Sequence, residues 1–509
     1  MQKIRIGLDI GTTAIKAAAY TPDGACLALA ERPNKVLRPA IGHCEQDMRA
    51  VWRAATECLK EISQQVPPQS IASLGICAQG DGFWAIDADG EPLDNAILWN
   101  DTRAAKDLDQ LTRAGACETI GKGNGTSLWP GTSGMIWRWL KQNDPLRAGK
   151  TWRVFTCADW IGYQLTGEIA TDYANGSIPF THLNSAEFSM AQFASIGCED
   201  LFDKIPHPRS AASLLGKVSA QIAKETGLPE GLPVSVGTLD LAAMITGMGL
   251  DQPGQTMLIM GTTAVVNILT DRLAQEPQPI GASALLPNGK TIIRIMAPST
   301  GAAAFDWFTA LHPLSLGGDN AGEVAQKLNA LVQTVPIGAN GVTFMPYLNG
   351  ERAPFVAPDL RASFLGMSSQ TTKAELGRAV MEGAAMSLRH CFESHSTLPQ
   401  SAVQLTGGGS KNSVWCQIIA DIIGQNVIVS PMSDQGLWGA ACLGAAAAEG
   451  GDPITLAARD QPAITYFCNA ENHRAYHAVY QRYDLMSRSL QALCKDLAAI
   501  EPHPEDPIP

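Results

Sequence analysis

One short pattern occurs twice in the chain, and it constrains the fold more than any other feature. Residues 4–20 and residues 257–267 each contain an apolar run, a Gly-Thr-Thr turn and a second apolar run. This pattern is typical of a β-hairpin. Because the two copies lie about half a chain apart, we expect two duplicated lobes whose hairpin turns face each other across a cleft.

The first turn has the residue types of a phosphate-binding loop. Gly11 lets the backbone approach a ligand closely, and successive N–H groups can surround phosphate oxygens together with the hydroxyls of Thr12 and Thr13. Asp9 ends the first strand, where its carboxylate can hold a divalent ion that neutralises those phosphates. A tight hairpin with a solvated Asp is the simpler interpretation of one copy, but the second copy favours a phosphate site. The predicted nucleotide-binding residues of the two hairpins are Asp9, Gly11, Thr12, Thr13, Lys16, Gly261, Thr262 and Thr263.

A third glycine cluster follows another apolar strand. Gly407, Gly408 and Gly409 lie between the strand at residues 404–406 and a helix-like segment at residues 413–424. A glycine turn that leads from a strand into a helix N-terminus suits the phosphates or ribose of a nucleotide. We therefore add these glycines and Asn412 to the predicted site, and the three loops together indicate an ATP site divided between two lobes.

With these loops in place, the chain resembles the FGGY family of carbohydrate kinases, within the actin-like ATPase fold. Residues 362–367 and 375–382 fit the family's C-terminal pattern, and residues 131–143 fit its N-terminal pattern except that Ile136 stands where a lysine is usual. The resemblance extends from about residue 4 to about residue 450. It implies an α/β protein with two actin-like (ribonuclease H-like) ATPase lobes around a central cleft.

The resemblance also implies an activity, which is the ATP-dependent phosphorylation of a terminal hydroxyl on a small sugar or polyol, with Mg2+ at the phosphates. We expect residues 1–247 to form an N-terminal lobe that carries the sugar site and the first phosphate hairpin. Residues 248–490 are expected to form the nucleotide-binding C-terminal lobe, and residues 491–509 a tail.

Composition narrows the class of protein. A content of 45% hydrophobic and 17% charged residues is ordinary for a soluble globular protein, and a net charge of −12 argues against a nucleic-acid surface. The twelve cysteines and nine histidines are scattered without metal-ligand spacing, so we expect buried thiols. The first residues enter a strand without an apolar segment of signal or membrane length, so we expect a cytoplasmic protein without a membrane partner. A homodimer is the commonest state of such enzymes.

Polar side chains follow the strand at residues 71–78, where an α/β sheet usually presents its ligand groups. Gln79 and Asp81 have the hydrogen-bonding groups that sugar hydroxyls need, although a solvated loop has the same composition. In the family's pattern the Trp, Asp and Arg of the Trp-Asn-Asp-Thr-Arg stretch belong to the sugar pocket, whereas a surface ion pair is the alternative. The predicted substrate-binding residues are Gln79, Gly80, Asp81, Trp99, Asp101 and Arg103.

Asp240 follows the strand at residues 232–237 and begins a helix. An acceptor hydroxyl loses its proton as the phosphate bond forms, and a nearby carboxylate can take that proton. The resemblance assigns this role to Asp240, which we predict as the catalytic base and, with Asp9, as a Mg2+ ligand; a helix N-cap is the structural alternative. Asp159 and Asp172 are secondary pocket candidates, and Asp159 is also expected to cap a short helix that Gly167 ends.

The substrate is less constrained. Kinases of D-xylulose in this family usually carry Gln-Met-His-Gly where residues 79–82 read Gln-Gly-Asp-Gly. Together with the Glu-Gln-Asp-Met stretch at residues 45–48, this form resembles kinases of L-xylulose or of erythritol. We expect Gly80 to enlarge or reshape the pocket and Asp81 to add an acceptor for hydroxyls. A ketopentose of the xylulose type is the expected substrate, erythritol is the alternative, and a non-catalytic sensor of ATP and sugar is the alternative of another class.

Several further elements are expected. Helices are predicted at residues 49–62 and 301–308 and from about residue 465 to about residue 499, before a frayed tail at residues 501–507. The small residues at 436–445 predict a helix that packs closely on a sheet. Glu351 and Arg352, in a Pro-x-x-x-Gly-Glu-Arg-x-Pro turn, are expected to brace the cleft.

Overall fold

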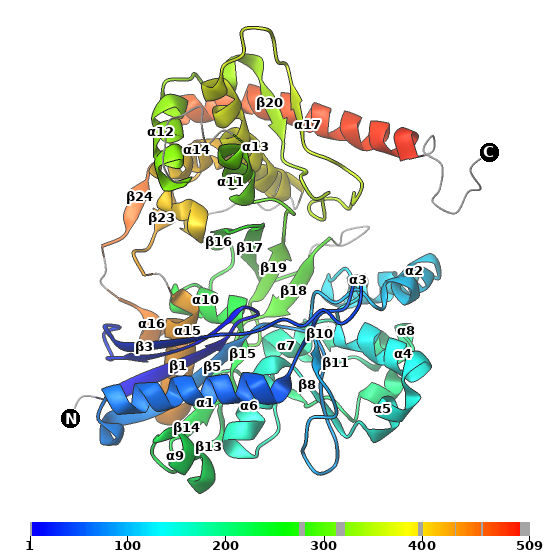
Figure 1. Cartoon of the computed structure of the whole chain (residues 1–509), viewed down its shortest axis with the longest axis vertical. Coiled ribbons are helices and arrows are strands. Elements are labelled where there is room, and N and C mark those ends of the chain that lie inside the picture. The colour runs from blue at the N-terminus through cyan, green and yellow to red at the C-terminus, as the bar shows by residue number, and fades with distance from the viewer. Residues whose placement is uncertain are drawn as a thin grey trace. The chain divides into compact units, whose positions relative to one another are not determined.

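A computed structural model describes residues 3–273, 280–311, 321–394, 401–432, 434–459 and 462–498. The chain forms two compact units, each with its own α/β architecture (Figure 1). The first unit contains Met1–Pro253, Leu269–Arg294 and Met432–Asp460, and the second contains Gly254–Ile268, Ile295–Pro431 and Gln461–Pro509.

The first unit is built on a seven-stranded sheet with the order β13-β14-β5-β1-β2-β3, in which β15 also pairs with β5. The chain runs antiparallel through β1, β2 and β3, whereas β14 and β1 lie parallel to β5. The predicted first hairpin is confirmed, with Asp9 paired opposite Lys16. The strands are β1 Ile4–Ile10, β2 Ala14–Tyr20, β3 Cys26–Pro33, β5 Ile71–Ala78, β13 Leu214–Lys217, β14 Pro233–Ser235 and β15 Thr238–Leu239.

Helices cover both faces of this sheet because its central strands β1, β2 and β5 are mostly buried on both sides. Along β2, Ala17 and Ala19 join the core under α1 (Met48–Gln65) and α6 (Cys157–Thr166). The alternate residues Ala18 and Tyr20 pack instead against α15 (Gln435–Glu449). Successive side chains of a strand point to opposite faces, so α1 and α15 lie on opposite sides of the sheet.

The helix α15 touches the sheet through backbone atoms. A Cβ on Gly7 would lie 2.0 Å from the carbonyl oxygen of Leu437, and a Cβ on Gly75 would lie 1.7 Å from that of Ala440. The predicted close packing of the small-residue helix at 436–445 is thereby confirmed. The same helix meets α10 (Asp240–Gly247) equally closely, because a Cβ on Gly439 would lie 1.8 Å from a carbonyl oxygen of α10. This contact fixes the helix that begins at the predicted base.

Around this sheet lie shorter elements of the first unit. An aromatic core beside it contains Phe83 stacked on Trp137, at 6.0 Å between ring centroids. The helices are α2 Ala105–Arg113, α3 Ala116–Asn124, α4 Ser133–Asn143, α5 Pro145–Lys150, α7 Tyr173–Ser177, α8 Met190–Ser195, α9 Ala220–Thr226 and α16 Pro453–Ala457. The short strands are β4 Glu45–Gln46, β6 Trp84–Ile86, β7 Ala96–Ile97, β8 Arg153–Phe155, β9 Thr171–Asp172, β10 Thr181–His182, β11 Glu187–Phe188 and β12 Pro208–Arg209.

The second seven-stranded sheet has the order β18-β19-β17-β16-β22-β23-β24. The second predicted hairpin is confirmed as the antiparallel pair of β16 and β17, and β22 runs parallel to both β16 and β23. Its strands are β16 Thr256–Met260, β17 Ala264–Thr270, β18 Ala282–Leu285, β19 Ile292–Met296, β22 Val403–Thr406, β23 Val427–Val429 and β24 Ile464–Tyr466.

Helices and a two-stranded sheet complete the second unit in the part of the chain that the structure describes. The helix α13 packs against α11, α12, α14 and β20. The predicted C-terminal helix begins later than expected, at Ala470, because residues 464–466 pair with β23 as a strand. The predicted tail at 501–507 lies outside the described residues. The elements are α11 Ala303–Ala310, α12 Ala321–Gln333, α13 Lys373–Ser394, α14 Ser413–Ile423, α17 Ala470–Ala498, β20 Thr343–Met345 and β21 Ser363–Leu365.

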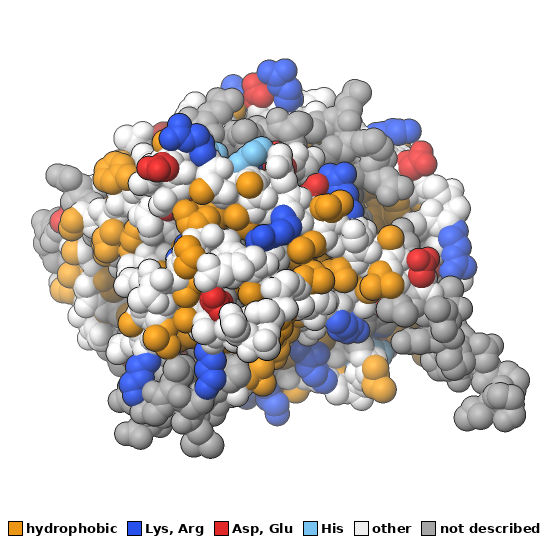
Figure 2. Space-filling model, turned by 90° about the horizontal axis from the view of Figure 1, so that it is seen from above, with side chains coloured by type: hydrophobic (Ala, Val, Ile, Leu, Met, Phe, Trp, Pro, Cys, Tyr) orange, Lys and Arg blue, Asp and Glu red, His pale blue; other side chains and the backbone are white. Residues whose placement is uncertain are grey.

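On the face drawn in Figure 2, the Lys and Arg side chains are scattered among hydrophobic and other polar groups. Within the described parts of the chain, we find no helix that combines the length and the apolar character needed to cross a membrane. The cysteines of these parts are free thiols, most of them buried.

Candidate functional site

Three adjacent strands of the first unit end together. Asp9 of β1 is paired with Cys77 of β5, which is paired with Thr238 of β15. Two residues further along the chain, the strands have ended and Gln79 and Asp240 emerge beside the Gly11 turn. In α/β sheets, ligands bind beyond the carboxyl ends of such strands. The register therefore brings the predicted Mg2+ ligand, base and sugar-binding glutamine to one edge of the sheet.

The two carboxylates at this edge are electrostatically linked. Burial, followed by the negative charge of Asp240, raises the pKa of Asp9 to about 7, and the Oδ1 atom of Asp9 is buried without a hydrogen-bond partner. Burial also raises the pKa of Asp240 to about 6, although the N–H of Leu241 donates to its Oδ1 at 2.6 Å. A cation beside these oxygens would relieve both costs.

These two carboxylates suit Mg2+ better than a metal that needs an all-protein cage. Among the described residues, no group of three or more His, Cys, Asp and Glu side chains is arranged to hold a metal ion. Mg2+ is usually held by one or two carboxylates and by substrate phosphates. Asp9 and Asp240, with the unpartnered Oδ1 atom of Asp9, therefore fit a Mg2+ ion that arrives with a nucleotide.

Residues that are distant in sequence hold the first Gly-Thr-Thr turn and its flanking lysine in place. The Nδ2 atom of Asn34 donates to the carbonyl oxygen of Gly11 at 2.8 Å, and the backbone N–H of Asn34 donates to that of Thr13 at 2.8 Å. Lys16, which we predicted beside the phosphates, forms a 3.0 Å ion pair with Asp434. Asn34 and Asp434 are far from the turn in sequence, and the sequence analysis did not identify them.

A closed ring of hydrogen bonds links the turn to the predicted sugar loop. Thr12 Oγ1 donates to Gln79 Oε1 at 2.9 Å, and Gln79 Nε2 donates to Gln46 Oε1 at 2.7 Å. Gln46 Nε2 closes the ring by donating to the carbonyl oxygen of Thr12 at 2.8 Å. The indole N–H of Trp99 also donates to Thr12 Oγ1, at 3.3 Å. Gln46 is fully buried, and its only signal in the sequence was the Glu-Gln-Asp-Met resemblance.

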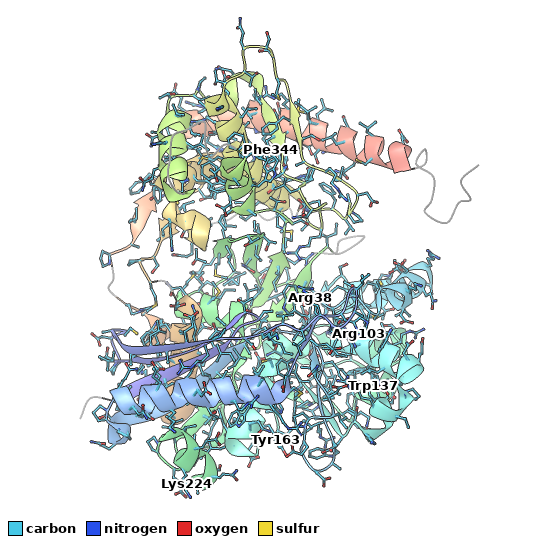
Figure 3. All side chains as sticks on the ribbon, in the orientation of Figure 1. Arg38, Arg103, Trp137, Tyr163, Lys224 and Phe344 are labelled. Atoms are coloured by element: carbon cyan, nitrogen blue, oxygen red, sulfur yellow. The ribbon has the colours of Figure 1, made fainter. Side chains whose placement is uncertain are left out.

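Asp101 and Arg103 pair with each other rather than standing apart. Arg103 Nε donates to Asp101 Oδ1 at 2.9 Å, Nη2 donates to Oδ2 at 2.9 Å, and Nη2 also contacts Glu45 at 2.6 Å. The N–H of Cys44 donates to Asp101 Oδ2 at 2.7 Å. Arg103, labelled in Figure 3, also lies 5.2 Å from the ring centre of Trp139. The alternative of a surface pair is wrong in one respect, because both side chains are buried.

Gly80 and Asp81 lie beside the residue that precedes the base. A Cβ on Gly80 would lie 2.2 Å from Cδ1 of Leu239, so Leu239 fills the space that a side chain at position 80 would take. We expected Gly80 to enlarge or reshape the pocket, and enlargement is wrong at this point because Leu239 occupies the space. Asp81 has a φ of 52°, and burial raises its pKa well above the usual range.

Asp81 lines a cavity together with Asp159, one of the two secondary pocket candidates, and with neighbours of Asp172, the other candidate. The cavity is bounded by Thr156, Asp159, Thr171 and Asn175 as well as by apolar side chains. Asp159 does not cap its helix as predicted, because the helix begins two residues earlier, with Thr156 as N-cap and Asp159 in the first turn. Gly167 ends that helix as predicted. Asp172 caps α7 instead, accepting from the N–H groups of Ala174 and Asn175.

In the second unit, the predicted nucleotide loops converge on the second hairpin. A Cβ on Gly407 would lie 2.7 Å from the carbonyl oxygen of Met260, and a Cβ on Gly409 would lie 2.8 Å from the Met260 side chain. The N–H of Ala302 donates to the carbonyl oxygen of Gly261 at 2.7 Å. The loops at 261–263, 301–302 and 407–409 therefore lie in contact. Residues 301–302 were not among the predicted site residues.

Two further polar groups support these loops. Asn412 caps α14 by accepting from the N–H of Trp415 at 3.2 Å, and its Nδ2 donates to Asn329 at 2.9 Å. Glu351 accepts from the N–H of Ser299 at 2.7 Å, and Arg352 donates to the carbonyl oxygen of Ala297 at 2.7 Å. The expected bracing pair thus holds the segment that leads to residues 301–302.

The comparisons with known proteins all indicate the same class of protein, the carbohydrate kinases. Models of the FGGY family of carbohydrate kinases match residues 4–247 with the N-terminal domain and residues 256–448 with the C-terminal domain. The L-xylulose/3-keto-L-gulonate kinase of Escherichia coli (strain K12) is 27% identical over 505 residues, covering 96% of this chain and 98% of that protein. The erythritol kinase of Brucella abortus (strain 2308) is 26% identical over 462 residues, 87% of each. The crystal structure of xylulose kinase from Rhodospirillum rubrum has a TM-score of 0.88 at 24% identity, covers 97% of this chain and 100% of that chain, and shows the shared fold.

Proposed function

Because the chain belongs to the FGGY family of carbohydrate kinases, we propose that it transfers the γ-phosphate of ATP to a terminal hydroxyl of a small sugar or polyol, with a ketopentose of the xylulose type as the first candidate. Asp240 is the base in this proposal. The observation that carries it is the shared sheet edge at which Asp9, Gln79 and Asp240 emerge. It supports a site where an acceptor hydroxyl and a phosphate meet.

The base is suited to its task by its surroundings. The pKa of Asp240, raised by burial to about 6, lies near neutral pH, where a carboxylate is ionised and still basic enough to take a proton. The carboxylate is held by the N–H of Leu241 and by the packing of α10 on α15. In the proposed step, Asp240 accepts the proton that the acceptor hydroxyl loses as its oxygen attacks the γ-phosphorus.

The phosphates are assigned to the two Gly-Thr-Thr turns, and the nucleoside to the loop at 407–409. When bound, Mg2+ would neutralise phosphate charge beside Asp9 and Asp240. Lys16 is then available to a phosphate oxygen by exchange with Asp434, its partner at 3.0 Å. In the second unit, the contact of Gly407 and Gly409 with Met260 supports a common role for these loops.

The sugar is assigned to Gln79, Asp81 and Trp99. Trp99 is 37% exposed, so its ring offers a flat apolar face to a carbon chain. Both carboxylate oxygens of Asp101 are engaged, because they accept from the N–H of Cys44 and from the N–H, Nε and Nη2 of Arg103. We therefore assign Asp101 and Arg103 to positioning the pocket wall rather than to the first contact with sugar.

Erythritol is the second candidate substrate. It is favoured by the Gln-Gly-Asp-Gly sequence at residues 79–82, in which Asp81 is the residue that differs in charge from the usual xylulose kinase pattern. A ketopentose and a four-carbon polyol share the terminal CH2OH group on which the proposed reaction depends. We place the enzyme in the cytoplasm, and a homodimer is the expected assembly.

The proposal is tested by measuring ADP release with Mg-ATP and single acceptors. The panel contains L-xylulose, D-xylulose, L-ribulose, D-ribulose, erythritol and glycerol. One strongly preferred acceptor, with a phosphorylated product detected by mass spectrometry, supports the kinase and identifies the substrate. Folded protein that binds ATP but phosphorylates none of them supports the non-catalytic sensor instead.

A further inference from the structure

The first Gly-Thr-Thr turn is held at each of its three carbonyl oxygens. The side-chain Nδ2 of Asn34 donates to the carbonyl oxygen of Gly11 at 2.8 Å, and the backbone N–H of Asn34 donates to that of Thr13 at 2.8 Å. Between these two contacts, Gln46 Nε2 donates to the carbonyl oxygen of Thr12 at 2.8 Å. Two residues outside the turn therefore fix the direction of all three of its carbonyl groups.

The N–H groups of the same turn are left open. Within the described residues, the structure gives the N–H groups of Thr12 and Thr13 no hydrogen-bond acceptor, and Thr13 is exposed. In a planar trans peptide, the C=O group and the N–H group of the next residue point in opposite directions. The N–H of Thr12 therefore points away from Asn34, and the N–H of Thr13 points away from Gln46. Open N–H groups in a turn are donors for an anion.

The second Gly-Thr-Thr turn shows the same division. The N–H of Ala302 donates to the carbonyl oxygen of Gly261 at 2.7 Å, and the N–H of Gly301 donates to that of Thr262 at 3.0 Å. The N–H groups of Thr262 and Thr263 likewise have no acceptor among the residues that the structure describes. Because the donors differ between the two turns, the division is a property of the turn itself and not of one neighbouring loop.

Asn34 reaches the first turn because of its place directly after β3. Pro33, the last residue of β3, pairs with Ala14, so the next residue of the chain lies beside the turn. Asn34 is 8% exposed, so water has little access to the contact that its amide makes with Gly11. A lost donor at this position leaves a carbonyl oxygen without its partner, which is costly where water cannot replace it.

We propose that Asn34 is a positioning residue for the phosphates of the nucleotide, which holds the carbonyl groups of Gly11 and Thr13 so that the N–H groups of the turn face the phosphate oxygens. The inference rests on the proposed function, since it concerns the ATP of that reaction. The carbonyl oxygen of Thr12 is held separately by Gln46, which belongs to the hydrogen-bonded ring with the predicted sugar loop. Asn34 therefore acts on the nucleotide, whereas Gln46 acts on the acceptor.

Two substitutions test this role. Asn34→Ala removes the side-chain donor, and Asn34→Asp keeps the size of the side chain but sets an acceptor against the carbonyl oxygen of Gly11. Both keep the backbone N–H that donates to Thr13, so the turn is loosened and not lost.

The measurements are the KM values for ATP and for the acceptor, and the calorimetric Kd of adenylyl imidodiphosphate with Mg2+, which is not hydrolysed. We expect the KM for ATP and this Kd to rise by about tenfold in Asn34→Ala, as for one buried hydrogen bond lost. The rise should be larger in Asn34→Asp, because its carboxylate adds negative charge near the phosphates. The KM for the acceptor should stay close to the wild-type value in both.

The control is Asn143→Ala. Asn143 Nδ2 also donates to a backbone carbonyl oxygen, that of Trp139 at 2.9 Å, but it does so at the end of α4. This variant should change neither KM value nor the Kd of the nucleotide analogue. Gln46→Ala is the complementary variant, because its loss should fall on the acceptor instead of on ATP. If Asn34 only stabilises the fold, its variants unfold at a lower temperature with unchanged nucleotide constants, and that result overturns the inference.

The outcomes separate the inference from the function on which it rests. A raised Kd of the analogue in the Asn34 variants, with no acceptor phosphorylated by the wild type, supports the positioning role and contradicts the kinase. Phosphorylation with unchanged nucleotide constants in the folded variants supports the kinase and contradicts the positioning role, as does an equal rise of both KM values. Far-ultraviolet circular dichroism and thermal unfolding show which variants are folded, and either one decides the case alone. If neither folds, Asn34→Gln decides it, because it keeps the amide but moves the donor by one methylene group.

Discussion

Asp9 in β1 and Asp240 directly after β15 lie on the two strands that pair with β5, and the charge of Asp240 adds to burial in raising the pKa of Asp9 to about 7. Two carboxylates that oppose each other's ionisation are an unstable arrangement in the free protein. They become favourable when a cation lies beside them. The sheet edge is thus arranged for a ligand that brings positive charge.

The first prediction concerns stability against pH. Because the pKa of Asp9 is raised in the folded state, the folded protein holds a proton that the unfolded chain has already lost, so stability falls as pH rises from about 4 to about 7. Asp9→Asn removes this loss and should stabilise the protein at pH 8 by roughly 4 kcal/mol relative to its effect at pH 4, because one pKa unit corresponds to about 1.4 kcal/mol. Urea unfolding at both pH values measures the difference. An equal effect at the two pH values would show that Asp9 is not the titrating group.

The second prediction concerns the hydrogen-bonded ring. Gln46→Ala removes one acceptor from Gln79 and one donor from Thr12, so both partners lose their orientation. We expect kcat/KM for the acceptor to fall by about tenfold and the free energy of unfolding by on the order of 1–2 kcal/mol. Gln65→Ala, at an exposed position at the end of α1, should change neither. Unchanged kinetics in Gln46→Ala would mean that the ring does not position the site.

The third prediction concerns the contact of α15 with the sheet. Gly75→Ala places a Cβ 1.7 Å from the carbonyl oxygen of Ala440, where only backbone movement can make room. We expect a loss of roughly 2–4 kcal/mol in the free energy of unfolding. Gly149→Ala is the matched control, because its Cβ would meet nothing within 4 Å and the helix gains about 0.5–1 kcal/mol from Ala. Similar unfolding midpoints for the two variants would contradict the close packing.

Sequence reasoning succeeded where the signal was local. Both Gly-Thr-Thr hairpins, the helix now seen as α1 and the small-residue helix α15 follow from alternation and helical periodicity over neighbouring residues. The resemblance to the family is also confirmed, since its motifs have fixed positions along the chain. These features need no knowledge of which distant segments meet.

The sequence failed where contacts join distant segments or where two local solutions compete. Gln46 and Thr12 are 34 positions apart, and Lys16 and Asp434 are 418 apart, so no local pattern pairs them. At α6, Thr156 and Asp159 both suit a helix start, and the capping box uses both, with Thr156 as the cap. At Gly80, only the fold reveals that Leu239 occupies the space left by the missing side chain.

The central claim is that Asp240 takes the proton from the acceptor hydroxyl, and Asp240→Asn tests it most directly. The measurement is the rate of phosphoryl transfer to the preferred acceptor in rapid-quench single turnovers across pH 5–8, with the Kd of ATP determined separately. In the wild type, we expect the rate to fall as pH drops below about 6, because protonated Asp240 is no base. In Asp240→Asn, we expect a loss of about a hundredfold to ten-thousandfold, an unchanged Kd and no such fall with pH. A variant that transfers phosphate at close to the wild-type rate would contradict the assignment.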